Sequence, residues 1–283
     1  MTAPIHLPDL TFIGEEANGF DGSTYQFGIQ SLNASPGGLP RTIQVIPSAY
    51  SVDGAVVETG GPVVGFPPIV AGNSFRLWAN GEGTGTAKLA NWDRVLQTHG
   101  FPQGIVFVRI HRVHYQDANG DIQLAPAIPA GLEDSLNNIF LEQAGVHILF
   151  LPGLDVLVNY LETPMPMTGS AANNAMLCNK VTVDSDLVLF FVPALDGAEG
   201  KAFKINSRGA LLHRTDPKAV AHEIGHCFGL AHCWSNENPS SLVKIMDREA
   251  KRLMGYRPGT ILRYEEVKRI RKWIEEPRPN LPQ

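Results

Sequence analysis

The chain has 283 residues and a formal net charge of −5, and 43% of its residues are hydrophobic while 18% are charged. This composition is ordinary for a folded globular protein and argues against intrinsic disorder. The charge is too small to indicate a nucleic-acid partner. The longest apolar stretches fall short of the ~20 residues that a membrane span needs, so we expect no membrane partner either.

Residues 1–100 have the pattern of a β-rich region punctuated by turns. Short strand-like runs, separated by Gly and Pro clusters, are expected at Ser23–Ile29, Thr42–Val52, Ala55–Glu58 and Ser74–Trp78. Lys88–His99 has the length of a short helix that Gly100 would close. No titratable cluster stands out, so we interpret residues 1–100 as an accessory domain or an N-terminal extension.

From residue 101 onwards strand and helix patterns alternate, which predicts an α+β or α/β domain over residues 101–283. Apolar side chains recur at helical spacing in Gly131–Ala144, and again at Val267, Ile270 and Ile274 of a closing helix. The strand-like runs are Gly104–Tyr115, Val146–Leu151, Asp186–Pro193, Lys201–Asn206 and Ala210–Arg214.

The loop Asp117–Asp121 reads DANGD, and its Asn-Gly pair favours a hairpin turn. Its carboxylates leave a structural Ca²⁺ site as the alternative, although the acidic residue that completes an EF-hand loop is missing.

Residues 222–232 read HEIGHCFGLAH and carry the clearest chemical signal. The HExxH spacing places His222 and His226 one turn apart on one helix face, so both imidazoles can reach one metal ion. A turn after the helix would return His232 to the same ion. Three neutral nitrogens and one open position are the ligand set of a catalytic zinc, so we expect one catalytic Zn²⁺.

The neighbouring residues fit a helix of limited length. Asp216 is a natural N-cap and Pro217 suits the first helical position, so the helix should begin there. Gly229 falls where the helix must end, and glycine tolerates the left-handed conformation that ends it. The full pattern arises by chance in roughly five of 100,000 shuffled sequences, which makes coincidence a poor explanation.

Glu223 follows the first histidine and is predicted to act as a general base that takes a proton from the attacking water. Two alternatives stay open. The third ligand of an HExxH hydrolase can instead be a downstream glutamate, here Glu265 or Glu266, although His232 and Gly229 would then be unexplained. The chain can also be a protease-fold binding or effector module with little catalysis, which the intact Glu223 argues against.

This segment resembles the metzincin metallopeptidases, whose signature HExxHxxGxxH it matches at every fixed position. The resemblance covers roughly residues 104–275. It implies a metzincin-like catalytic domain with a twisted mixed sheet, a zinc-binding helix and a C-terminal helix. It further implies a zinc endopeptidase that acts on a protein or peptide substrate.

Metzincins also carry a Met-turn beneath the three histidines, and Met246 and Met254 are the candidates. The resemblance favours Met254, because Leu253-Met254-Gly255-Tyr256 directly precedes the closing helix. In metzincins with a Met-x-Tyr turn the tyrosine lies beside the zinc. Tyr256 is therefore expected to bind the metal loosely at rest and to donate a hydrogen bond to the oxyanion. A tyrosine packed beside a turn is the alternative.

An extended substrate of a metzincin lies antiparallel to the edge strand of the sheet, a form of β-augmentation. By order along the chain that strand comprises Lys201, Ala202, Phe203, Lys204, Ile205 and Asn206. An ordinary buried strand is the alternative.

Three further expectations concern the subfamily, the location and other partners. Cys233 follows the third histidine, as in archaemetzincins, but the further cysteines of that subfamily are missing; Cys233 could instead pair with Cys178. Metzincins usually act outside cells while the first residues show no signal peptide, so a secreted or otherwise exported protein and a cytoplasmic one both stay open. A protein inhibitor or immunity partner is a further candidate partner.

Overall fold

The computed structural model describes residues 10–14, 24–28, 41–47, 52–65, 68–79, 81–90, 92, 94–101, 104–181, 184–232, 252–255, 259–262 and 264–281. The chain folds into two compact units. The first comprises Met1–Gly104, Phe140–Val146 and Ile261–Val267. The second comprises Ile105–Ile139, His147–Thr260 and Lys268–Gln283.

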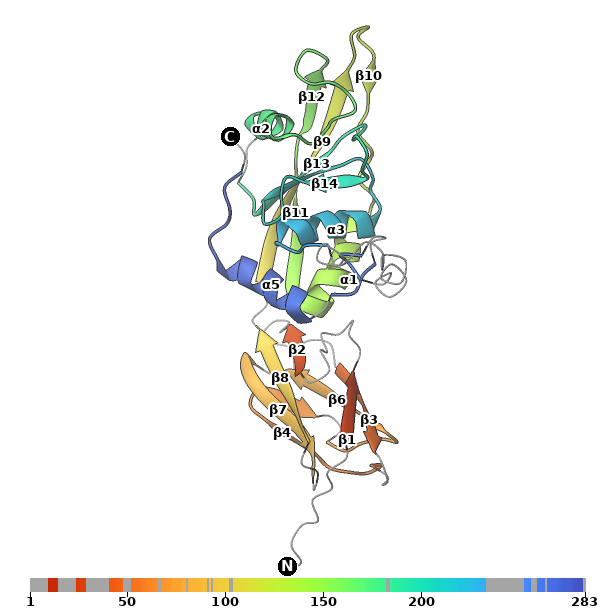
Figure 1. Ribbon diagram of the computed structural model, residues 1–283, viewed down its shortest axis with the longest axis vertical. Coiled ribbons are helices and arrows are strands. Elements are labelled where there is room, and N and C mark those ends of the chain that lie inside the picture. Colours follow the sequence, from red (N-terminus) through yellow and green to blue (C-terminus); the bar gives the residue numbers. More distant parts are fainter. Residues whose placement is uncertain are drawn as a thin grey trace, which may run out of the picture. The chain divides into compact units, whose positions relative to one another are not determined.

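The first unit contains two four-stranded sheets, drawn in red to yellow in Figure 1. One has the order β1-β3-β6-β5, with β1 at Leu10–Gly14, β3 at Arg41–Pro47, β6 at Ser74–Ala79 and β5 at Val63–Gly65. The other has the order β2-β8-β7-β4, with β2 at Thr24–Gly28, β8 at Val95–Phe101, β7 at Gly83–Leu89 and β4 at Val57–Gly60.

Both sheets supply side chains to one core, so the unit is a β-sandwich. Ile43 and Leu77 come from the first sheet, and Ala87, Leu89 and Leu96 come from the second. This arrangement confirms the β-rich N-terminal region that its turn-punctuated sequence predicts.

The helix predicted at Lys88–His99 is wrong, because β7 and β8 pair antiparallel across this stretch. Leu96 and Thr98 are buried and alternate with exposed neighbours, which is the period of a strand. A Cβ on Gly100 would lie 2.3 Å from the Gly81 carbonyl oxygen, so this glycine allows two backbone segments to approach closely and does not close a helix.

The second unit is built on a seven-stranded mixed sheet of order β10-β9-β13-β15-β14, in which β11 and β12 also pair with β9. β13 runs parallel to both β9 and β15, whereas β14 is antiparallel to β15 and forms an edge of the sheet. The strands are β9 at Gly104–Gln116, β10 at Ile122–Gln123, β11 at Val146–Leu151, β12 at Asp155–Asn159, β13 at Leu187–Phe191, β14 at Gly200–Ala202 and β15 at Gly209–Leu212.

Four helices accompany the sheet among the described residues: α1 at Leu132–Ala144, α2 at Ala171–Asn179, α3 at Pro217–Cys227 and α5 at Tyr264–Glu275. Leu177 and Cys178 of α2 share a buried cluster with Leu211 of β15. Its neighbour Leu212 points to the opposite face, where α3 packs on β14 and β15. Helices therefore cover both faces of this sheet.

The DANGD loop forms the predicted hairpin turn between β9 and β10. The Asp117 carboxylate accepts hydrogen bonds from the backbone N–H groups of Asn119 and Asp121, which stabilises the turn.

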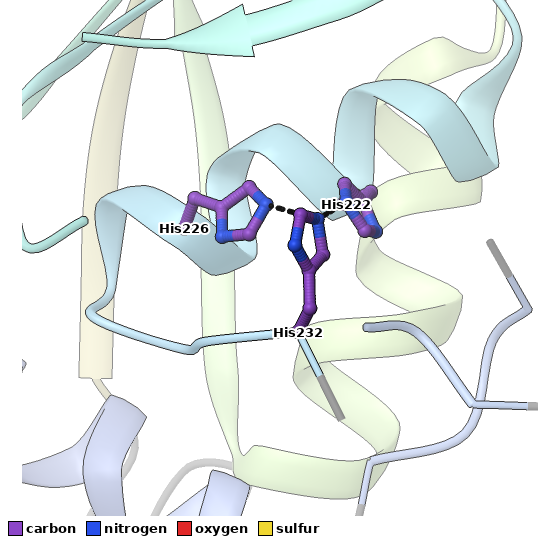
Figure 2. Close-up of side chains that lie close together, drawn as sticks. All are labelled: His222, His226 and His232. Atoms are coloured by element: carbon purple, nitrogen blue, oxygen red, sulfur yellow. Dashed lines mark hydrogen bonds between the residues drawn. The ribbon is translucent and has the colours of Figure 1, made fainter. Parts of the chain in front are cut away.

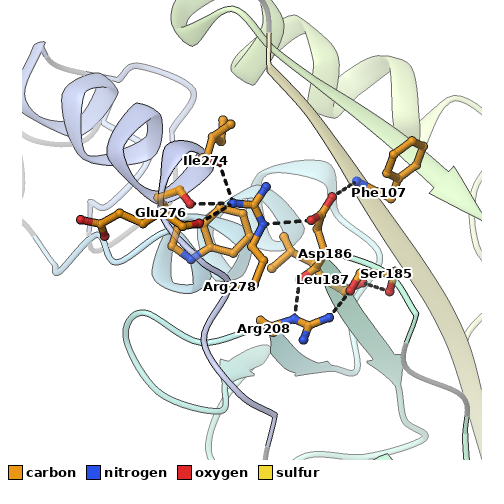
Figure 3. A network of polar contacts seen from close by, with 9 residues as sticks. Phe107, Ser185, Asp186, Leu187, Arg208, Ile274, Glu276 and Arg278 are labelled. Carbon is orange, nitrogen blue, oxygen red and sulfur yellow. Dashed lines mark hydrogen bonds and ion pairs between the residues drawn. The ribbon is translucent and has the colours of Figure 1, made fainter.

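A polar network anchors the segment that follows α5 (Figure 3). The Arg278 side chain donates to the carbonyls of Trp273 and Ile274 at the end of α5, and to Asp186 next to β13 at 2.9 Å. Its guanidinium also lies 4.2 Å from the centre of the Trp273 ring. The Asp186 carboxylate in turn accepts from the backbone N–H of Phe107 in β9. One arginine therefore caps α5 and ties its end to two strands.

These elements confirm the predicted fold class: a mixed α+β fold with few helices, preceded by a β-rich region. The observed β9, α1, β11, β13, β15, α3 and α5 correspond to the predicted elements of residues 101–283. Among the helices that the structure describes, none combines the length and apolar character that a membrane crossing requires.

Candidate metal centre

Helix α3 begins where its sequence predicts. Asp216 is the N-cap, and its carboxylate accepts from the backbone N–H groups of Lys218 and Ala219 at 2.9 and 3.1 Å. Pro217 occupies the start of the helix, where its missing N–H costs nothing. The start of the helix sets the rotation of the helix and therefore the direction in which its histidines point.

The helix ends in a Schellman motif around Gly229, whose φ is +87°. The Leu230 N–H donates to the Gly225 carbonyl and the Gly229 N–H donates to the His226 carbonyl, both at 2.9 Å. The chain turns back after this motif and brings His232 to the helix face that carries the other two histidines.

The three histidines converge on one point (Figure 2). The Nε2 atoms of His222 and His226 lie 3.2 and 3.1 Å from Nε2 of His232. Three nitrogens that bind one tetrahedral zinc at about 2.0–2.1 Å are about 3.3 Å apart, so the observed spacing fits that ion. Among the described residues, these three make up the cluster of His, Cys, Asp and Glu ligand atoms that could hold a metal.

The hydrogen bonds of two rings fix which nitrogen is free. Nδ1 of His222 lies 2.8 Å from the Leu253 carbonyl, and Nδ1 of His226 lies 2.8 Å from the Leu230 carbonyl. A carbonyl oxygen can only accept a hydrogen bond, so Nδ1 of each ring carries the proton. In a neutral ring, Nε2 then carries a lone pair that can bind a metal. A neutral His232 can donate to one of them at most, so at least one of the two Nε2–Nε2 contacts has no hydrogen bond, whereas a cation could bind all three nitrogens.

Burial keeps these rings neutral. It lowers the pKa of His222 to about 4 and also lowers the pKa of His226 and of His232. Neutral imidazoles are the form that binds a metal, so the site is ready for an ion near pH 7.

Leu253 and Met254 contact the helix that carries two of the histidines. Leu253 supplies the carbonyl that orients His222. Met254 is fully buried, and a Cβ built on Gly225 of α3 would lie 2.7 Å from its Sδ. The methionine therefore packs directly against the helix at the residue before His226, and a side chain larger than hydrogen there would displace it.

The Glu223 side chain contacts the edge of the sheet. Its Oε2 accepts a hydrogen bond from the backbone N–H of Ala202 in β14 at 2.6 Å. The side chain is 7% exposed, and burial raises its pKa to about 7, against the lowering effect of the Ala202 N–H. The carboxyl group is not among the ligand atoms of the cluster.

The edge strand is shorter than predicted. β14 covers Gly200–Ala202, and residues 203–206 form bends. The Asn206 backbone has a left-handed φ of +59°, and its N–H donates to the His226 carbonyl at 2.9 Å. The end of this segment therefore turns towards α3 instead of extending the strand. Lys201 lies within the strand, and its Nζ donates to the Thr168 carbonyl.

Several predicted positions lie outside the described residues: Tyr256, Met246, Cys233 and the side chain of Glu265. Cys178 is a buried free thiol.

Other contributors to the site are backbone groups that a motif search cannot find. They are the carbonyls of Leu253 and Leu230 and the N–H of Ala202. Gly225 could be noticed in the sequence, because a glycine inside an otherwise helical segment usually has a packing or functional reason.

The comparisons with known proteins bear on this centre. The family model described as "Metallo-peptidase family M12B Reprolysin-like" matches residues 196–261, which include β14, α3 and all three histidines. A search of curated protein sequences finds no match.

Two solved structures are similar to the chain at 16% identity. Archaemetzincin from Methanopyrus kandleri has a TM-score of 0.37, and the match covers 60% of this chain and 97% of that one. A chaperone–substrate complex has a TM-score of 0.38, with 72% and 43% covered. Scores this low support no conclusion about fold or activity.

The family match confirms the resemblance to zinc metallopeptidases of the metzincin type that the motif predicts, over a minor part of the chain and without a subfamily. The centre and the matched segment are together similar to those of metal-dependent peptidases.

Proposed function

We propose that the chain is a zinc-dependent endopeptidase in which His222, His226 and His232 hold one zinc ion. The observation that carries the proposal is the spacing of 3.1–3.2 Å between Nε2 atoms, two of which belong to rings whose Nδ1 protons are already bound to carbonyls. Those two carbonyls would fix the ring orientation of the ligands, a role that outer-shell groups commonly have in zinc sites.

When bound, zinc supplies a Lewis acid that lowers the pKa of a coordinated water to about 7 and polarises a carbonyl. Glu223 is the general base in this proposal: it accepts the proton of the attacking water and returns it to the leaving amine. A cation among the imidazoles would favour the carboxylate form of Glu223 over the protonated form that burial favours.

The supporting residues have separate roles. Gly229 allows the turn that returns His232, and Met254 packs beneath the helix as the Met-turn methionine. Tyr256 follows two residues later and is proposed to donate a hydrogen bond to the oxyanion. We also propose that residues 101–283 form the peptidase domain and that residues 1–100 form an accessory domain.

The substrate in this proposal is a protein or peptide that pairs with the outer side of Gly200–Ala202. Three residues of edge strand allow few main-chain hydrogen bonds, and the Ala202 N–H is already bound to Glu223. Contacts beyond this short strand must therefore supply much of the substrate affinity.

Replacement of Glu223 by Ala tests the proposal. We expect the variant to bind zinc as the wild type does and to lose about 10²–10⁴-fold in the rate of cleaving a peptide library, because general-base help is removed. Zinc content is measured on protein purified without chelator. Unchanged proteolysis by Glu223→Ala would refute the role of this residue, and a wild type that binds zinc without cleaving any peptide would favour a binding or effector module.

A further inference from the structure

The outer side of β14 presents its main-chain groups to Glu223. The Phe203 N–H donates to the Gly209 carbonyl and the His213 N–H donates to the Glu199 carbonyl, so hydrogen-bonded pairs alternate along the β14–β15 ladder. Ala202 stands opposite Ala210 between such pairs, and its N–H therefore points away from β15. This N–H makes no ladder bond and is free to bind another group.

The group that it binds is the Glu223 carboxylate, at 2.6 Å from nitrogen to Oε2. When Glu223 is ionised, this contact is a charge-assisted hydrogen bond, which is stronger than one between neutral groups. The approach is also tight elsewhere in the strand: a Cβ on Gly200 would lie 2.6 Å from Glu223 Cγ. The Glu223 side chain thus packs closely on Gly200 while its carboxyl group reaches the Ala202 N–H.

We propose that Ala202 is a positioning residue whose backbone N–H holds the catalytic base, and that this N–H is not a substrate subsite. The inference rests on the proposed function, because it assigns a role relative to Glu223 as the base. The hydrogen bond holds one carboxylate oxygen and leaves the other available to water. A peptide on the edge strand would then pair with the carbonyls of Gly200 and Ala202, and its register would skip the occupied N–H.

Amide hydrogen exchange tests the contact without any measurement of activity. The outward N–H of an edge strand exchanges rapidly unless something protects it. We expect the Ala202 amide to be protected in the wild type and to exchange at least ~10-fold faster in Glu223→Ala, while the Phe203 amide, which is in the ladder, changes little. Equal exchange of the Ala202 amide in both proteins would overturn the proposal.

Kinetics then separate positioning from substrate binding. Proline is tolerated at an edge-strand position whose N–H faces outward, so Ala202→Pro removes this donor without breaking a ladder bond. We expect kcat to fall about 10–100-fold, the usual cost of losing an outer-shell partner, with KM changed less than ~3-fold and zinc content unchanged. Ala202→Gly keeps the N–H, so its kcat should fall less than the kcat of Ala202→Pro. A rise in KM with kcat unchanged would assign the N–H to the substrate instead.

The Glu223→Ala background supplies the control. If the N–H acts through Glu223, Ala202→Pro should lower the residual kcat of Glu223→Ala by less than ~2-fold. An equal fractional loss in both backgrounds would contradict the proposal. If Ala202→Pro fails to fold, replacing Ala202 with lactic acid, which exchanges the N–H for an ester oxygen, makes the same comparison. A wild type that cleaves no peptide would refute the proposed function alone. The exchange experiment would still show whether the Ala202 N–H is bound to Glu223.

Discussion

Gly225 has no side chain beyond a hydrogen atom, which lets Met254 pack closely against α3. It is the only glycine in α3, and in an ordinary helix its replacement by Ala would stabilise by about 1 kcal/mol. Here the new Cβ would lie 2.7 Å from the Sδ of the buried Met254. Overpacking of a tight core costs about 1–3 kcal/mol, which equals or exceeds the helix-propensity gain.

We therefore expect Gly225→Ala to lower the free energy of unfolding by up to about 2 kcal/mol in denaturant melts. It should also weaken zinc binding, because the displaced residue directly precedes His226. Met254→Ala is the matched background: it costs about 2–5 kcal/mol by itself but removes the clash, so Gly225→Ala should then be neutral or stabilising. Stabilisation by Gly225→Ala in the wild type would contradict the close packing of Met254.

At the scale of elements, α5 supports the end of α3. Trp273 of α5 packs edge-on against Phe228, the C-cap of α3, with ring centres 4.9 Å apart. The Arg278 guanidinium lies over the Trp273 ring and forms an ion pair with Asp186 at 2.9 Å. Phe228 lies between two of the proposed ligands along the chain, so the C-terminal helix indirectly holds the turn that carries His232.

Arg278→Ala should lower the free energy of unfolding by about 1–3 kcal/mol, because the charge pair with Asp186 and the cap of α5 are lost together. Their side chains are only 22% and 21% exposed, so solvent screens them little. Lys272→Ala is the control on the same helix. Its ion pair with Glu276 has exposures of 72% and 56%, and its loss should change stability by less than ~0.5 kcal/mol. Equal effects of the two substitutions would mean that the Arg278 network is not stabilising.

At the scale of the whole molecule, short sequence signals at helix ends predicted the helix that carries two of the three histidines. Asp216, Pro217 and Gly229 mark both ends of α3, because caps and left-handed turns depend on a few adjacent residues. Tertiary contacts decided the rest. β8 is a strand because β7 pairs with it, and the predicted edge strand ends early because Asn206 turns towards the His226 carbonyl.

The groups that orient the centre could not be read from the sequence. Leu253 lies 31 positions from His222, and it contributes a carbonyl that every residue type possesses. The Ala202 N–H is likewise a group that every residue except proline possesses, and it binds Glu223, which is 21 positions away. Such contacts follow from the packing of β14 and the Leu253–Met254 segment on α3. The spacing of residues along the chain cannot predict them.

Zinc stoichiometry is the most direct test that the three imidazoles share one ion. Equilibrium dialysis with metal analysis should give one zinc per chain for the wild type. His232→Ala should lose at least about 100-fold in affinity, since a ligand is lost and outer-shell changes alone cost 10–100-fold. Glu266→Gln, which removes the alternative downstream ligand, should bind zinc like the wild type. Unchanged zinc affinity in His232→Ala, or its loss in Glu266→Gln, would contradict the three-histidine centre.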